Sequence, residues 1–119
     1  MVVLIDDDPG TLKSVGRLLK VCGFEVRLFS SAEAFWAERS SIDAACLILD
    51  IHLGGMSGID LRRELARSGY QTPVIFLTAD GSEFTRRSAE QAGCMGYIEK
   101  PFVAATLIEA VRKAIGTNS

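Results

Sequence analysis

The sequence is poor in cysteine, in long apolar runs and in basic residues. Its three cysteines, Cys22, Cys46 and Cys94, are odd in number and widely separated, and no C-x-x-C pair occurs. This argues against both a disulfide framework and a structural zinc site. No apolar run approaches the ~20 residues that cross a bilayer, and no basic, then apolar leader precedes the first strand-like segment. We therefore expect a cytoplasmic protein that does not contact membranes.

The charge balance excludes a further class of partner. Thirteen Lys and Arg against 15 Asp and Glu give a formal charge of -2, and proteins that hold nucleic-acid phosphates concentrate basic side chains. The 119 residues, 48% of them hydrophobic and 24% charged, are typical of one globular domain. We expect residues 1–119 to form a single domain, with 116–119 as a tail or the start of a linker.

Short apolar segments alternate with helical patterns along the chain. Five segments have strand length, at 2–5, 26–29, 46–49, 74–77 and 96–98. Three of them lack polar alternation, which indicates strands covered on both faces, as in a parallel sheet. Five such alternations predict a doubly wound α/β fold, in which right-handed crossovers place helices on both faces of an open parallel sheet.

The helix boundaries follow from capping signals. Asp8 before Pro9 predicts the start of the first helix, and Ser30 or Ser31 the start of the second. Met56 is assigned to a third helix together with the leucines that follow Ser57. A fourth helix is predicted over about 82–92, and a fifth ends before Gly116.

Polar side chains follow four of the five predicted strands. Because parallel strands all end at one edge of the sheet, these residues should meet there, where ligands bind in such folds. They are Asp6, Asp7, Asp8, Asp50, Thr78 and Lys100.

Crowded carboxylates favour a cation. With only oxygen donors at hand, Mg²⁺ is preferred over Zn²⁺, and Mn²⁺ is the alternative. Lys100 and Thr78 could then hold a phosphoryl group while Asp50 attacks phosphorus. Each feature alone has an ordinary explanation, such as a solvated cap cluster for the acids, but their coincidence at one edge favours a shared site.

The motifs VVLIDDDP, LILDIHLGGMSGIDL, VIFLTAD and GYIEKPF resemble, in combination and order, the receiver domain of two-component response regulators. The resemblance covers essentially the whole chain. It implies a flavodoxin-like (βα)5 fold with strand order 2-1-3-4-5. It also implies that Asp50 accepts a phosphoryl group from a histidine kinase's phosphohistidine.

The same resemblance implies a metal site. Asp7 and Asp50 should bind Mg²⁺ directly, the backbone carbonyl of His52 should be a third protein ligand, and Asp6 should act mainly through water.

It further implies how phosphorylation is sensed. Thr78 and Lys100 correspond to the hydroxyl and the lysine that contact the phosphoryl group, and the Lys100–Pro101 peptide is expected to be cis. Tyr97 matches an aromatic switch residue whose movement reshapes the face made by the fourth helix, the fifth strand and the fifth helix. His52 and Asp80 occupy positions that tune self-dephosphorylation, although the His52 side chain is interpreted as a solvated loop group.

The implied partners are a sensor histidine kinase or phosphotransfer protein and a second copy on phosphorylation. The stretches SSAEAFW and MSGIDLRREL most resemble receivers fused to DNA-binding output domains, but a stand-alone receiver and a receiver of a hybrid kinase stay open. Such a domain is a switch with slow self-dephosphorylation and not a turnover enzyme. Two alternatives stay open at this point: a phosphatase with an aspartyl-phosphate intermediate and a flavodoxin-like electron carrier. The phosphatase is disfavoured by a nucleophile on the third strand, and the electron carrier by acids where a flavin phosphate would lie.

Overall fold

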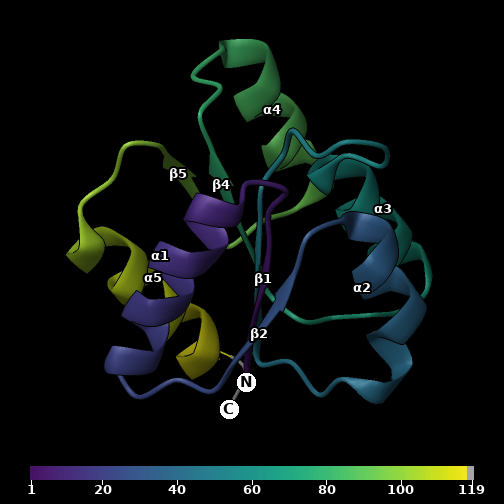
Figure 1. Cartoon of the computed structure of the whole chain (residues 1–119). Coiled ribbons are helices and arrows are strands. Elements are labelled where there is room, and N and C mark those ends of the chain that lie inside the picture. Colours follow the sequence, from purple (N-terminus) through teal and green to yellow (C-terminus); the bar gives the residue numbers. More distant parts are fainter. Residues whose placement is uncertain (118–119) are drawn as a thin grey trace.

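The computed structural model describes residues 1–117 as five strands and five α-helices in strict alternation (Figure 1). One 3-10 turn, 39–41, follows the second helix. The elements are β1 (Val2–Ile5), α1 (Pro9–Val21), β2 (Val26–Phe29), α2 (Ala32–Glu38), β3 (Cys46–Leu49), α3 (Gly58–Arg67), β4 (Val74–Thr78), α4 (Glu83–Ala92), β5 (Gly96–Glu99) and α5 (Ala104–Thr117).

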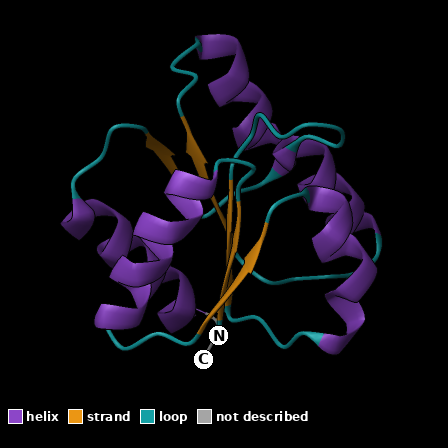
Figure 2. Cartoon of the chain, viewed as in Figure 1, coloured by secondary structure: helices purple, strands orange, loops and turns teal. Residues whose placement is uncertain are grey.

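The strands form one sheet in the order β2-β1-β3-β4-β5, and every pairing is parallel (Figure 2). This confirms the predicted doubly wound fold and its strand order. β1 and β3 lie at the centre and are apolar and buried throughout. Their register pairs Ile5 with Leu49, so the residues after them, Asp6 and Asp50, end side by side.

Helices cover both faces of the sheet. α1 and α5 lie on one face and α2, α3 and α4 on the other (Figure 1). Alternate residues of each central strand divide between the two cores, so that Val3 and Ile5 pack against α2 and α3 while Val2 and Leu4 pack against α1 and α5. Removing this apolar surface from water stabilises the fold by about 25 cal/mol per Å².

Side-chain caps start four helices at the carboxyl edge of the sheet. Asp8, Ser31, Ser57 and Ser82 each accept a hydrogen bond from a backbone N–H in the first turn. Such caps satisfy N–H groups that have no partner within the helix and typically contribute ~1 kcal/mol. The Asp8 prediction is confirmed, and the choice between Ser30 and Ser31 falls on Ser31.

Two predicted boundaries are wrong. Met56 precedes α3, because Ser57 adopts extended backbone angles as the cap and the helix begins at Gly58. α5 continues through Gly116 to Thr117, since a single glycine costs a helix only about 1 kcal/mol relative to alanine. The first two residues of the predicted tail or linker start, 116–117, thus belong to α5, and 118–119 lie outside the described residues. None of the helices in residues 1–117 is long and apolar enough to cross a membrane.

Candidate functional site

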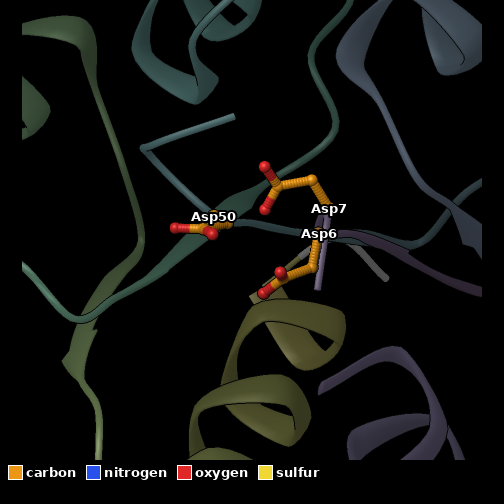
Figure 3. Close-up of side chains that lie close together, drawn as sticks. All are labelled: Asp6, Asp7 and Asp50. Carbon is orange, nitrogen blue, oxygen red and sulfur yellow. The ribbon is translucent and has the colours of Figure 1, made fainter. Parts of the chain in front are cut away.

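The polar residues predicted to meet do lie together at the carboxyl edge of the sheet. Asp6 follows β1, Asp50 follows β3, Thr78 ends β4 and Lys100 follows β5. One carboxylate oxygen each from Asp6, Asp7 and Asp50 lies within 4.8 Å of the others, and Figure 3 shows the three side chains close together. Three acids thus share a space that one small cation would fill.

Lys100 reaches this cluster from β5. Its Nζ lies 2.9 Å from Oδ2 of Asp6 and 3.8 Å from Oδ2 of Asp50. Asp6 is fully buried, and its Oδ1 accepts a hydrogen bond of 2.9 Å from the backbone N–H of Asp8. One ammonium therefore faces three carboxylates, and the cluster carries excess negative charge.

Asp50 shows the effect of this imbalance. Burial raises the pKa of its carboxyl, and the neighbouring charge of Asp6 raises it further. Lys100 and the backbone N–H of His52, which lies 3.3 Å from Oδ1, act in the opposite direction but do not prevail. The folded chain thus holds the charged form of Asp50 at a cost that a nearby cation would offset.

The donor set fits a hard divalent cation. Carboxylate oxygens on a partly exposed edge, with no thiolate or imidazole nitrogen in the cluster, match the preference of Mg²⁺ for oxygen ligands and retained water. Asp7 is exposed and Asp50 is only slightly accessible. An ion bound here would therefore have protein ligands on one side and solvent on the other.

Thr78 is buried at the end of β4. Its hydroxyl oxygen accepts a hydrogen bond of 3.1 Å from the backbone N–H of Asp80. The same loop is held from β5, where the Tyr97 hydroxyl donates to the Asp80 carbonyl at 3.0 Å. The half-buried Tyr97 ring has the Arg86 guanidinium 5.7 Å from its centroid, and burial raises the pKa of its hydroxyl.

The interpretation of His52 as a solvated loop side chain is confirmed, but the side chain also has a partner that the sequence did not reveal. Its ring is 62% exposed, yet Nε2 lies 2.7 Å from Oδ2 of Asp80. The two loops that flank Asp50 are therefore bridged over a sequence separation of 28 residues. Hydrogen bonds from the Ser82 amide first, then from His52 and Thr85, hold the pKa of Asp80 well below its usual range.

Gly58 packs closely against the backbone of Asp50, a contact that the sequence did not reveal. A Cβ atom at this position would lie 2.2 Å from the backbone carbonyl oxygen of Asp50. The Gly58 N–H also donates to the carbonyl of Ile51 at 2.9 Å. The only sequence signal is a glycine directly after the cap residue Ser57, where a better helix former would otherwise be expected.

Glu33 on α2 is a second residue that the sequence did not reveal. Its Oε2 accepts a hydrogen bond of 2.9 Å from the backbone N–H of Met56, which lowers the pKa of the Glu33 carboxyl. A Cβ at Gly55, where φ is +88°, would come within 2.6 Å of the same oxygen. Glu33 thus fixes the position of the glycine-containing loop after Asp50 through a hydrogen bond from α2. The Lys100–Pro101 peptide, which follows β5, is cis, as predicted.

The chain was compared with known families and proteins. The family model of the response regulator receiver domain matches residues 2–112. The response regulator protein TmoT of Ectopseudomonas mendocina is 36% identical over 115 residues, which are 97% of this chain and 52% of TmoT. The transcriptional regulatory protein FixJ of Azorhizobium caulinodans is 34% identical over 99% of this chain and 56% of FixJ.

Solved structures agree with this assignment. The structure titled FixJ-N is 34% identical, with a TM-score of 0.91 over 97% of this chain and 92% of the other. The response regulator StyR has the same TM-score at 33% identity, over 98% of this chain and 59% of StyR. The chain spans about half the length of the curated relatives it matches. The chain belongs to the family of response regulator receiver domains.

Proposed function

We propose that this domain accepts a phosphoryl group on Asp50 from the phosphohistidine of a sensor histidine kinase or phosphotransfer protein. The observation that carries the proposal is the meeting of Asp6, Asp7 and Asp50 with Lys100 at one edge of the sheet. A carboxylate oxygen of Asp50 attacks phosphorus and the P–N bond breaks. The electron pair of the broken P–N bond stays on the imidazole nitrogen, which takes a proton. The product on this chain is an aspartyl phosphate.

The residues around Asp50 have separate tasks in this step. Asp7, Asp50 and the His52 carbonyl would hold Mg²⁺ directly, with Asp6 acting through water, and the ion would offset negative charge that develops on the phosphoryl oxygens. Lys100 lies 3.8 Å from Asp50, so its ammonium can pair with a phosphoryl oxygen there. The Thr78 hydroxyl would donate to another oxygen after it leaves the Asp80 N–H.

The readout would be the face formed by α4, β5 and α5. Thr78 and Tyr97 both bond to Asp80, which supports a route from the site to this face. Phe84 of α4 is 80% exposed, so this helix presents a large apolar side chain to solvent. Because the relatives are about twice as long, we propose a fused output domain of DNA-binding type and dimerisation through this face on phosphorylation.

The product is proposed to be a signal and not a released metabolite. We expect slow self-dephosphorylation at a rate tuned by His52 and Asp80, whose side chains contact each other beside Asp50.

The test is phosphorylation by acetyl phosphate, followed by intact-mass measurement. The wild-type chain should gain one phosphoryl group in the presence of Mg²⁺ and none in EDTA. Asp50→Asn should gain none, whereas Asp43→Asn, which changes an exposed aspartate elsewhere, should behave like wild type. A phosphoryl group that persists in Asp50→Asn, or rapid multiple turnover of the donor, would contradict the proposal.

A further inference from the structure

Asp80 is the most highly connected side chain beside the site. Its Oδ1 accepts the Ser82 N–H at 2.8 Å, and its Oδ2 accepts the Thr85 hydroxyl at 2.8 Å and lies 2.7 Å from His52 Nε2. Its backbone is also occupied on both sides. The N–H donates to Thr78 and the carbonyl accepts from Tyr97. The residue is thereby fixed from every direction by groups of the described chain.

The partners of Asp80 come from different parts of the fold. His52 lies on the loop after β3, Thr85 on α4 and Tyr97 on β5. The loop between β4 and α4 is therefore tied to three neighbouring elements through one residue. Thr85 is 7% exposed, so water does not readily replace its hydroxyl as a donor to the carboxylate.

The proposed switch would disturb both backbone bonds of Asp80. The Thr78 oxygen accepts the Asp80 N–H, so a turn of the Thr78 side chain toward a phosphoryl group on Asp50 would weaken this bond. Tyr97 can leave its present position only by giving up the Asp80 carbonyl. The side-chain bonds that hold Asp80 in place therefore set how costly both movements are, and a ligand can shift this equilibrium only against that cost.

We propose that Asp80 and Thr85 are positioning residues that latch the unphosphorylated arrangement and so lower the affinity of the site for a phosphoryl group. The inference rests on the proposed function of Asp50. Thr85 is its clean test, because this side chain bonds to Asp80 and to Ser82 and to none of the acids of the cluster.

A simpler role would be support of the helix start. Ser82 caps α4 and accepts the Thr85 N–H at 3.2 Å, so the Asp80 contacts could serve only to stabilise this turn. That role predicts a loss of stability in a Thr85 variant and no gain in affinity. The latch predicts a gain in affinity, and the two roles are therefore separable.

The experiment compares Thr85→Val with Thr85→Ser and with Thr106→Val, a matched change at an exposed position of α5. The probe is beryllofluoride with Mg²⁺, a stable mimic of a phosphoryl group, titrated into each protein. Thr85→Val should bind it about threefold to tenfold more tightly, the effect of one lost hydrogen bond on the equilibrium. Thr85→Ser and Thr106→Val should match wild type.

A second readout does not depend on phosphoryl chemistry. Each protein is labelled with 3-fluorotyrosine, and Tyr70→Phe assigns the Tyr97 signal in the 19F NMR spectrum. In Thr85→Val without ligand, this signal should move toward its beryllofluoride-bound position or, if wild type binds no beryllofluoride, away from its wild-type position. Unchanged or weaker binding by Thr85→Val would overturn the latch. If wild type binds no beryllofluoride, the proposed function of Asp50 is rejected. The latch is then tested by the Tyr97 signal alone, and a signal that Thr85→Val does not move would overturn it.

Discussion

Asp50 and Asp80 lie after neighbouring strands at the same edge of the sheet, yet their surroundings are opposite. Asp50 is buried beside two other acids, and its pKa is raised, mainly by burial. Asp80 receives hydrogen bonds on both carboxylate oxygens, and its pKa is held low, mainly by the Ser82 amide. The charge of Asp50 is poorly compensated by the protein, and the charge of Asp80 is stabilised by three hydrogen bonds.

From this difference we infer that Asp50 is the reactive carboxylate and Asp80 a structural one. A chain that leaves charge uncompensated in its interior loses stability, and such positions concentrate at functional sites. A carboxylate that already has three hydrogen bonds within the protein holds a loop in place and has less capacity left for a ligand. The carboxyl edge thus contains an acidic cluster that a cation would stabilise, next to a loop held by its own hydrogen bonds.

The largest effect is expected from a substitution that removes the close packing between Gly58 and the Asp50 backbone. Gly58→Ala places a Cβ 2.2 Å from the Asp50 carbonyl oxygen, and because both partners are backbone, they must move apart. We expect a loss of about 3 kcal/mol in the free energy of unfolding, measured by urea denaturation. Gly54→Ala is the control, since nothing lies within 4 Å of its added Cβ. Equal losses in both variants would show that the close approach is not tight.

The next largest effect is expected from Mg²⁺, which should stabilise the Asp80 variant but not the Asp50 variant. At ten times its dissociation constant, the ion should stabilise the wild-type chain by about 1.4 kcal/mol, seen as a rise in the thermal midpoint. Asp50→Asn should lose most of this gain, and Asp80→Asn should keep it. An equal Mg²⁺ response in wild type and Asp50→Asn would contradict the assignment of the acids as the metal site.

Without metal, the two aspartates should respond to neutralisation with opposite signs. Asp50→Asn should raise the thermal midpoint by about 3 °C, because it removes a buried charge near Asp6. Asp80→Asn should lower the midpoint, because it weakens the bonds from Ser82, Thr85 and His52. Shifts of the same sign would abolish the distinction between the two residues.

The pH dependence follows from the same pKa directions. A carboxyl whose pKa is raised in the folded state binds protons more tightly there, so Asp50 makes the free energy of unfolding fall as pH rises above 3.8. Asp80, whose pKa is lowered, adds stability above its unfolded pKa and loses it as pH falls toward the folded value. In urea denaturation from pH 3 to 7, Asp50→Asn should therefore gain on wild type as pH rises.

The smallest effect is expected from a change at Glu33, which bonds to the loop after Asp50. Glu33→Ala removes the acceptor for the Met56 N–H, and the loosened loop should weaken Mg²⁺ binding about twofold. Isothermal titration would measure this against Glu25→Ala, a change of an exposed glutamate that directly precedes β2. No difference between the two variants would leave Glu33 without a role in positioning the loop.

Much of the site was predictable because a parallel sheet collects strand ends at one edge. Periodicity located the strands, and the residues after them, Asp6, Asp50 and Lys100, then had to converge. The positions of Thr78 and Asp8 were predictable for the same reason, because Thr78 ends a strand and Asp8 caps a helix. Local pattern is enough where the contact is set by the topology itself.

The remaining features depend on contacts that no local pattern encodes. The bond between His52 and Asp80 joins loops 28 residues apart, and Glu33 reaches Met56 across 23 residues. Gly58 is required by the path of the Asp50 backbone, which appears only once β3 and α3 are packed. Gly116 was misassigned as a helix end because a glycine near the end of a pattern usually is one.

The central claim is that Asp50 is the residue that takes the phosphoryl group. It is tested most directly by treating the phosphorylated chain with borohydride, which reduces an aspartyl phosphate to homoserine, and then mapping the peptides by mass spectrometry. The account predicts homoserine at position 50 and an unchanged aspartate at 6, 7, 8 and 80. Homoserine at any of those positions, with Asp50 intact, would contradict it.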